Sequence, residues 1–250
     1  MRLCVVLPCF FRNTDFCSAV RSVASLGYDA VELWGWGDID PESAEAVLKE
    51  TGVELLSMCV TEFRLTDPAY RSAFYEGVKK TCEFASRLGV KRLITQVGAD
   101  TGADRAFQHR SIVDGLSAVA PVLEKYGITL MIEPLNTLFD HKGYYLTSSA
   151  EAFDIVREVS SPFVKVIYDI YHQQITEGNI IPTITSNLQY IAHLHCAGHP
   201  GRHEPWLGES DYRVIIDAID KAGYDGAIGL EYFPTLDATE SLKRAREIFA

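Results

Sequence analysis

The 250-residue sequence contains no apolar run of 18 residues, so it offers no candidate for a transmembrane helix. The apolar stretch at residues 1–8 is too short for the hydrophobic region of a signal peptide. The six cysteines include no CxxC pair and are scattered through a mid-sized chain, unlike the disulfide frameworks of small secreted domains. These absences predict a cytoplasmic protein with reduced, mostly buried thiols and no membrane partner.

The chain has fewer basic residues than acidic residues. The chain has 23 Lys and Arg against 34 Asp and Glu, which gives a formal net charge of −11 at pH 7. Such a negative field repels nucleic acid, so a DNA or RNA partner is not expected. A small anionic substrate is still compatible with this charge, because one arginine and a bound cation can reverse the local sign.

A glycine-rich phosphate-binding loop is also missing after the first apolar run, which argues against an open nucleotide-binding sheet. The sequence instead has eight short apolar runs that alternate with helical patterns, and several of these patterns end at a glycine. Uniformly apolar runs of this kind predict buried parallel strands covered by helices. The predicted strands are 3–7, 30–33, 54–59, 92–96, 129–133, 164–168, 191–195 and 227–231. The predicted helices begin near residues 13, 41, 68, 105, 149, 179, 212 and 238, and the one at 179–190 has the weakest pattern.

Eight strand–helix pairs in 250 residues, with no linker-like segment, are typical of one closed barrel. We therefore predict an α/β fold, a (β/α)8 TIM barrel, as a single domain over residues 1–250.

Four of the predicted strands end at a side chain of the kind that binds metals. Glu133, Asp169, His195 and Glu231 end strands five to eight, at separations of 36, 26 and 36 residues. Neighbouring strands lie about 4.8 Å apart and barrel active sites sit at the carboxyl ends of the strands, so these side chains can meet. Three converging carboxylates would repel one another without a cation. Three oxygen donors and one imidazole predict a site for Mn²⁺ or Mg²⁺.

Other polar side chains near these ends are candidates for substrate binding. His172 follows Asp169 by three residues and can reach a substrate oxygen, or it can simply pack in its loop. Arg202 lies in a Gly-Arg-His-Glu loop and can clamp a substrate oxygen, although a solvated arginine is the alternative. Glu204 can bind substrate or orient Arg202 or His172. Glu32, at the end of strand two, can support the site or order a loop.

Several motifs resemble those of the hydroxypyruvate isomerase family, which belongs to the xylose-isomerase-like barrels. They are Ile-Glu-Pro-Leu-Asn at 132–136, Tyr-Asp-Ile-Tyr-His at 168–172, Glu-Gly-Asn at 177–179, His-Cys-Ala-Gly-His-Pro-Gly-Arg-His-Glu-Pro at 195–205 and Gly-Leu-Glu-Tyr at 229–232. The resemblance covers essentially the whole chain. It implies that Glu133, Asp169, His195 and Glu231 hold the metal, that Glu133 and Glu231 are the catalytic acid–base pair, and that His172 and Arg202 bind substrate.

The chain departs from this family at two places. Some hydroxypyruvate isomerases have glutamine where this chain has His195, and many have a basic Lys-Pro-Arg-Gly turn where this chain has Phe-Pro-Thr-Leu at 233–236. The loss of those positive charges makes a neutral ketose a competing substrate for a keto acid such as hydroxypyruvate.

The function that we expect is therefore a metal-dependent isomerase acting on a small sugar or keto-acid substrate by proton transfer between two glutamates. Delivery of the proton from the opposite glutamate to the original carbon would instead give a ketose 3-epimerase. A lyase, a hydrolase or endonuclease with several metals, and a non-catalytic sugar-binding barrel are the remaining alternatives. The sequence does not identify the substrate, and it leaves open whether the protein forms a homo-oligomer.

Overall fold

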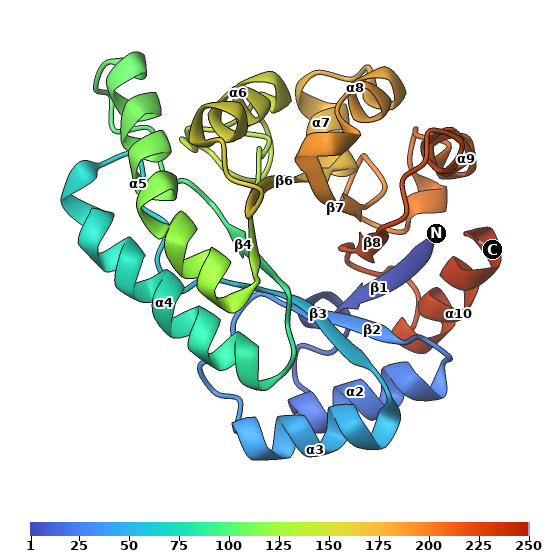
Figure 1. Ribbon diagram of the computed structural model, residues 1–250. Coiled ribbons are helices and arrows are strands. Elements are labelled where there is room, and N and C mark those ends of the chain that lie inside the picture. Colours follow the sequence, from blue (N-terminus) through green and yellow to red (C-terminus); the bar gives the residue numbers. More distant parts are fainter. Residues whose placement is uncertain (250) are drawn as a thin grey trace.

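The computed structural model describes residues 1–249 as a closed barrel of eight parallel strands in sequence order. β1 pairs with both β2 and β8, which closes the barrel, and the helices lie around its outside (Figure 1). The strands are β1 (Arg2–Val6), β2 (Ala30–Leu33), β3 (Glu54–Cys59), β4 (Arg92–Thr95), β5 (Thr129–Ile132), β6 (Val164–Asp169), β7 (Ile191–Cys196) and β8 (Ala227–Leu230). The predicted (β/α)8 TIM barrel is confirmed.

The helices agree with the predicted pattern at most of their ends. They are α1 (Leu7–Phe10), α2 (Phe16–Ser25), α3 (Pro41–Thr51), η1 (Pro68–Tyr70), α4 (Arg71–Arg87), α5 (Arg105–Tyr126), α6 (Ser149–Val159), α7 (Ile170–Thr176), α8 (Ile180–Ser186), η2 (Leu188–Tyr190), η3 (Pro205–Leu207), α9 (Tyr212–Lys221) and α10 (Ala238–Ile248). The Asp40 carboxylate accepts the backbone N–H of Ser43 at 2.9 Å and starts α3. Gly52 ends the same helix with a φ of 71°, a left-handed conformation that glycine adopts without strain.

Several helical segments differ from the sequence prediction. The short helix α1 begins at Leu7, which the prediction gave to the first strand, and two further differences lie closer to the site. The helix expected over residues 179–190 is divided into α8 and η2, because the backbone at Asn187, with a φ of −128°, leaves the helical conformation. The sequence pattern does not predict helix α7. It begins directly after β6, where the Asp169 carboxylate accepts the backbone N–H of Tyr171 at 2.8 Å. Asp169 therefore ends a strand and caps a helix at once.

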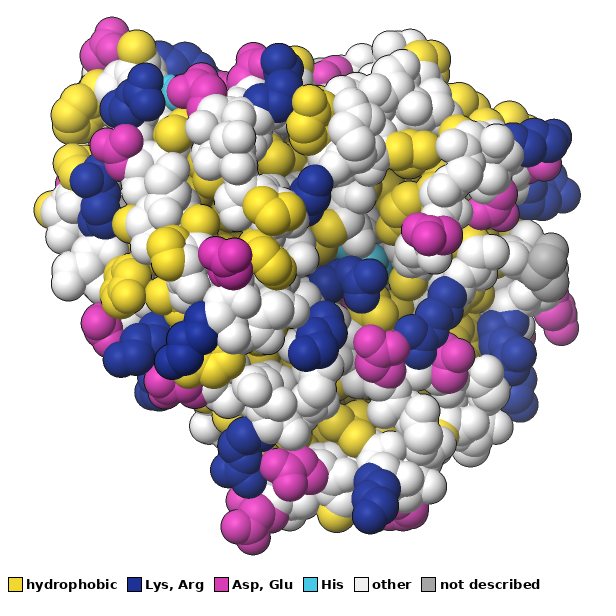
Figure 2. Space-filling model, viewed as in Figure 1, with side chains coloured by type: hydrophobic (Ala, Val, Ile, Leu, Met, Phe, Trp, Pro, Cys, Tyr) yellow, Lys and Arg dark blue, Asp and Glu magenta, His cyan; other side chains and the backbone are white. Residues whose placement is uncertain are grey.

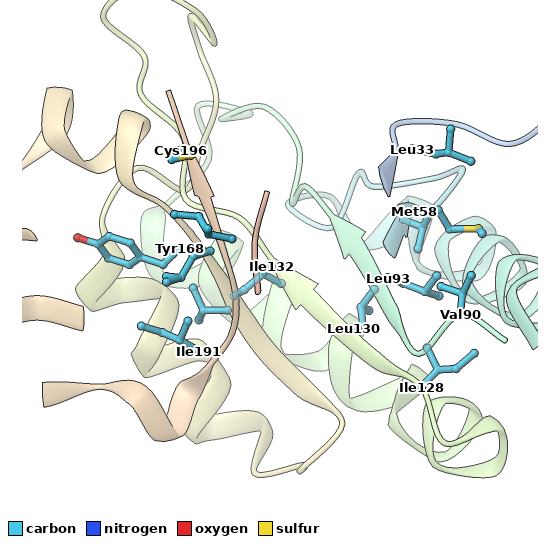
Figure 3. Packing of buried hydrophobic residues seen from close by; sticks show 14 of the residues in the cluster. Leu33, Met58, Val90, Leu93, Ile128, Leu130, Ile132, Tyr168, Ile191 and Cys196 are labelled. Carbon is cyan, nitrogen blue, oxygen red and sulfur yellow. The ribbon is translucent and has the colours of Figure 1, made fainter. Parts of the chain in front are cut away.

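Alternation along the strands divides the core from the barrel interior. Leu130 and Ile132 of β5 belong to the large cluster between strands and helices, whereas Met131 belongs to a separate small cluster with Ile94 and Ile167. Figure 3 shows Leu93, Leu130 and Ile132 among the packed apolar side chains. Because successive side chains on a strand point to opposite faces, Asp169 lies on the same inner face as Ile167. The strand period thus directs the rim side chains inward.

The surface mixes charges of both signs. Figure 2 shows acidic and basic side chains interspersed over one face, with histidine atoms visible below basic side chains near its centre. All six cysteines lie in the described part of the chain, and each is a free thiol there. Among residues 1–249, every helix falls short of the length and apolar character that a bilayer crossing requires.

Packing of α5 on the barrel gives a test of the core. Leu116 is 0% exposed, so Leu116→Ala should lower the free energy of unfolding by about 2–5 kcal/mol, because it removes apolar contacts and leaves a cavity. Phe107 on the same helix is 53% exposed, and Phe107→Ala should change that free energy by about 0.5 kcal/mol or less. Urea denaturation of both variants checks this. Equal changes in the free energy of unfolding would show that α5 does not pack on the barrel through Leu116.

Candidate functional site

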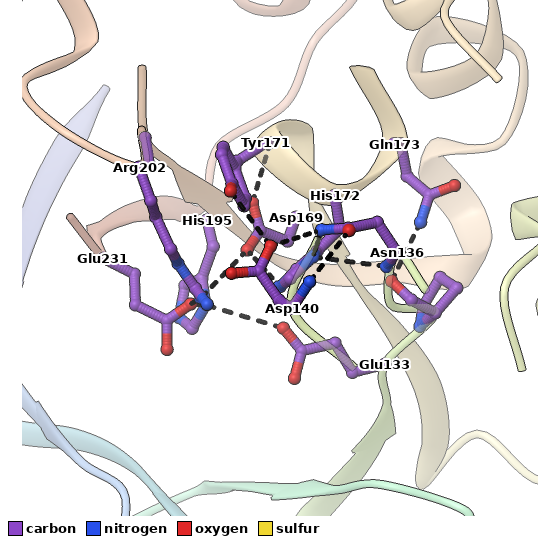
Figure 4. Close-up of polar contacts among 12 residues, drawn as sticks. Glu133, Asn136, Asp140, Asp169, Tyr171, His172, Gln173, His195, Arg202 and Glu231 are labelled. Carbon is purple, nitrogen blue, oxygen red and sulfur yellow. Dashed lines mark hydrogen bonds and ion pairs between the residues drawn. The ribbon is translucent and has the colours of Figure 1, made fainter. Parts of the chain in front are cut away.

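The carboxyl-terminal rim of the barrel carries four side chains from consecutive strands. Glu133 directly follows β5, Asp169 ends β6, His195 lies in β7, and Glu231 directly follows β8. Each of the four is at most 6% exposed. Figure 4 shows them gathered around a common centre with Arg202 and His172. The structure therefore brings together the four side chains that the sequence placed at strand ends.

The donor atoms of this rim lie close enough to share one ion. One atom each of Glu133, Asp169, His172 and Glu231 lies within 4.8 Å of the others. His195 Nδ1 is 3.3 Å from Glu231 Oε2 and 3.9 Å from Glu133 Oε1. His172, predicted from sequence as a substrate contact, is thus also part of the cluster.

Unpaired buried atoms mark the space between these side chains. Glu133 Oε1, Asp169 Oδ2 and His195 Nδ1 have no hydrogen-bond partner among residues 1–249. A buried polar atom without a partner costs about 1–3 kcal/mol, and more when it is charged. A divalent cation would satisfy all three atoms, and an oxygen-rich donor set with one imidazole is one that such ions accept. The residues present fit a divalent cation.

His172 differs from His195 in the position of its proton. His172 Nδ1 faces the side-chain amide nitrogen of Asn136 at 2.7 Å and accepts the Asn136 backbone N–H at 3.3 Å. Burial, helped by the charge of Arg202, holds the pKa of His172 well below its usual value, so the ring is neutral. Its proton therefore resides on Nε2, 3.5 Å from Asp169 Oδ2. His172 presents an N–H donor to the cavity and not a lone pair.

The rim carboxyl groups have very different acidities in the absence of a cation. Burial and repulsion by Glu231 raise the pKa of Glu133 to about 8 and that of Asp169 to about 6. Burial acts in the same direction on Glu231, but the charges of Arg202 and His195 outweigh it and hold the pKa of Glu231 well below its usual value. One glutamate is thus held ionised and the other tends to keep its proton.

Arg202 lies beside the carboxylates, where the sequence predicted a substrate contact. Its guanidinium donates to Glu231 Oε2 at 2.5 Å and lies 3.8 Å from Asp169 Oδ2. The guanidinium carbon is 5.2 Å from the centre of the Tyr171 ring. Trp34 Nε1 donates to the other Glu231 oxygen at 2.7 Å. Both oxygens of Glu231 are therefore anchored by side chains at the mouth.

The contacts of Glu204 do not favour the substrate role that the sequence suggested. Its buried carboxylate accepts hydrogen bonds from the Thr235 backbone and hydroxyl, the Leu236 backbone and the Ser241 hydroxyl, at 2.9–3.2 Å. All of these partners belong to the segment after β8, and Glu204 is not among the residues that line the rim cavity. Glu204 therefore fastens that segment to the loop after β7, and the hydrogen bonds of its carboxylate in the described part of the chain include none to Arg202 or His172.

A cavity of about 330 Å³ opens above the rim. Its lining combines the rim groups with apolar side chains, namely Trp34, Cys59, Val60, Phe63, Gln96, Glu133, Leu135, His141, His172, Arg202 and Glu231. Trp34 and Phe63 are 40% and 41% exposed, so the mouth keeps open aromatic faces. Trp36, by contrast, is buried and stacks on Phe84 with ring centres 4.4 Å apart.

Sequence reasoning missed the groups that hold His172. Asn136 donates to Asp140 Oδ2 at 2.7 Å, and the Tyr171 hydroxyl donates to the same oxygen at 3.0 Å. Asn136 stands inside the Ile-Glu-Pro-Leu-Asn motif, so that motif was a usable signal. Asp140 lies in a loop with no periodic pattern, and nothing in the sequence marked it.

Comparisons with known proteins agree with the barrel fold. A family model for the xylose isomerase-like TIM barrel matches residues 20–248. Hydroxypyruvate isomerase of Escherichia coli (strain K12) is 30% identical over 252 residues, which span 97% of each chain. The 2-oxo-tetronate isomerase of Cupriavidus necator is 34% identical over 176 residues, which span 70% of this chain and 67% of that protein. A crystal structure of a protein named AP endonuclease, family 2, from Brucella melitensis is 26% identical, with a TM-score of 0.92 over 96% of each chain.

The raised pKa of Glu133 predicts a pH-dependent stability for the metal-free protein. Between pH 4.5 and about 8 the unfolded chain releases this proton while the folded protein keeps it, so this group makes stability fall as pH rises. Glu133→Gln removes the effect, so its stability relative to the parent should rise steadily across that window. Urea denaturation with a chelator present measures it. Glu209→Gln, a change at an exposed position, is the control variant, and a flat difference for Glu133→Gln would contradict the assignment.

Proposed function

Because the chain belongs to the xylose isomerase-like TIM barrel family, we propose that it is a divalent-metal-dependent isomerase of a small hydroxy-keto acid or sugar. One observation carries the proposal. Two glutamates, Glu133 and Glu231, face one cavity, and one oxygen of each lies within 4.8 Å of the other. Two carboxylates placed in this way can take a proton from one carbon of a small substrate and return it to another. The names of the two isomerase relatives agree with this chemistry.

Glu133, Asp169, His195 and Glu231 would hold the metal. Three carboxylates and one imidazole favour Mn²⁺ or Mg²⁺ over zinc, which prefers more nitrogen or sulfur ligands. When bound, such an ion acts as a Lewis acid that makes the C–H group between a carbonyl and a hydroxyl more acidic.

The proton moves through the two glutamates. The carboxylate of one glutamate takes the proton from a carbon next to the carbonyl, and the electron pair shifts onto the carbonyl oxygen. Return of a proton to the former carbonyl carbon, while the hydroxyl proton passes to the former carbonyl oxygen, completes an aldose–ketose type of isomerisation. His172 supports this step by donating its Nε2 proton to a substrate oxygen, since its Nδ1 is occupied by Asn136. Arg202 holds a second oxygen at the mouth.

A specific feature of the cavity favours a second candidate, a ketose 3-epimerase acting on a neutral sugar. Of the described residues that line the cavity, Arg202 is the only lysine or arginine, and its guanidinium already pairs with Glu231. A substrate carboxylate would compete with that pair. The open ring of Phe63 and the side chains of Val60 and Leu135 suit the carbon chain of a ketose better than a second anion.

A nuclease is a weaker reading, although the similar protein from Brucella melitensis is named an endonuclease. The net charge of −11 opposes binding of a polyanion. The proposed ligand set serves a single ion, whereas a metal-dependent nuclease of this kind would need more histidine and aspartate ligands. Metal analysis distinguishes the two, because more than one tightly bound ion per chain would favour the nuclease.

Removal of either glutamate tests the mechanism. Glu133→Gln and Glu231→Gln should each lower kcat by about 10²–10⁴-fold, because glutamine cannot take or give the proton. The assay needs Mn²⁺ at a concentration that calorimetry shows to saturate each variant, so that a lost ion is not mistaken for a lost base. Glu209→Gln on the exposed loop serves as the control. A kcat within threefold of that of the parent for both cavity variants would contradict the proposed proton transfer.

Deuterated water identifies the substrate. We expect hydroxypyruvate or 2-oxo-tetronate to be isomerised in the presence of Mn²⁺ or Mg²⁺, with deuterium from the solvent appearing on the carbon that receives the proton. NMR of the products of a panel that also contains C4–C6 ketoses measures this. Faster labelling at C3 of a neutral ketose would select the epimerase instead, and no labelling of any member would contradict both candidates.

A further inference from the structure

A buried network lies inside the barrel, below the rim. Glu32 of β2 is 1% exposed, and its carboxylate faces His193 Nε2 at 2.9 Å and His195 Nε2 at 3.2 Å. The Ser57 hydroxyl of β3 donates to the same carboxylate. Strands β8 and β1 separate β7 from β2, so Glu32 reaches across the barrel to the two histidines. Nothing in the proposed proton transfer uses this carboxylate.

The network fixes where His195 carries a proton. An ionised carboxylate only accepts hydrogen bonds, so each ring nitrogen that faces Glu32 carries its proton there. With Nε2 directed at Glu32, His195 turns Nδ1 toward the rim, where it lies 3.3 Å from Glu231 Oε2 and 3.9 Å from Glu133 Oε1. A histidine that binds metal through one nitrogen commonly donates the other N–H to a carboxylate, which orients the ring.

Gly229 makes room for this contact. A Cβ atom at that position of β8 would lie 2.5 Å from Glu32 Oε1 and 2.5 Å from His195 Cδ2. Any other residue would therefore push the carboxylate and the ring apart. The φ of Gly229 does not demand glycine, so close approach is the reason for glycine here.

We propose that Glu32 is a positioning residue for the metal centre. It holds His195 in the orientation and protonation in which Nδ1 can bind a divalent cation, with Ser57 and His193 fixing the carboxylate from its other sides. The inference rests on the proposed function in one respect, that His195 is a ligand of the ion.

Metal affinity provides the first test. Glu32→Gln and Gly229→Ala should each raise the Mn²⁺ dissociation constant by about 10–100-fold, measured by calorimetry on the full chain. Glu204→Gln is the matched control, because it also changes a buried glutamate, but one that contacts only the segment after β8. It should change the dissociation constant by threefold or less. Unchanged affinity in a folded Glu32→Gln variant would overturn the inference.

The ring protons provide a second test that needs no metal and no activity. In the metal-free protein, NMR should show slowly exchanging Nε2 protons for both His193 and His195. Glu32→Gln should leave at most one of them, because the glutamine side chain offers a single acceptor oxygen. Persistence of both ring protons would overturn the inference, even if the variant proved too unstable for calorimetry.

His195→Ala separates this inference from the proposed function. If that variant binds Mn²⁺ as tightly as the parent, His195 is not a ligand and the proposed ligand set fails; the ring protons then decide the role of Glu32 alone. If His195→Ala loses the ion while Glu32→Gln keeps it, the ligand set stands and the positioning role is wrong.

Discussion

Repulsion among three buried carboxylates is the constraint on which the rim of this barrel depends. Glu133, Asp169 and Glu231 lie at most 6% exposed with donor atoms within 4.8 Å of one another. Taking each ion out of water costs several kcal/mol, and bringing like charges together adds to it. The raised pKa values of Glu133 and Asp169 express that cost. A closed barrel can hold such a group because hydrogen bonds along both edges of every strand leave the backbone little freedom to move apart. The arrangement has a chemical purpose, since apolar side chains would pack the same space more stably.

The two buried histidines at the rim show how backbone placement assigns different tasks to one residue type. His172 receives hydrogen bonds from Asn136 on Nδ1, so its proton faces the cavity on Nε2. His195 directs Nε2 at Glu32, so a lone pair on Nδ1 is what it can offer the ion. The first is therefore suited to a substrate oxygen and the second to a cation. Neither assignment follows from residue type or burial, because both side chains are almost fully buried.

The parts of the fold that the sequence predicted are those governed by periodicity and by helix-ending residues. Apolar runs and terminal glycines predicted all eight strands, and with them the convergence of Glu133, Asp169, His195 and Glu231. The sequence does not indicate a residue's second role, or the direction in which a side chain of a non-periodic loop points. Asp169 reads as a strand end, and its second role as the N-cap of α7 is visible only in three dimensions. Glu204 lies two residues after Arg202 in the sequence, yet its carboxylate points away from the cavity and accepts the Thr235 N–H. Loop residues follow no repeat, so neighbours in the chain can face opposite directions.

That loop also bears on the choice of substrate. Arg202 has a φ of 57°, an uncommon left-handed conformation for an arginine, and its carbonyl accepts the Phe233 N–H at 2.8 Å. Gly198 and His203 pair across the same loop through two backbone hydrogen bonds of 2.8 and 3.2 Å. The loop backbone thus brings Arg202 to the side of Glu231, to which its guanidinium donates a hydrogen bond. The carboxylate of a keto acid would have to share the Arg202 guanidinium with Glu231 and Asp169. A neutral ketose would need only the hydrogen-bond donors of the cavity that are not already paired. We therefore expect the position of this loop, more than the net charge of the chain, to set how well the cavity tolerates an acidic substrate.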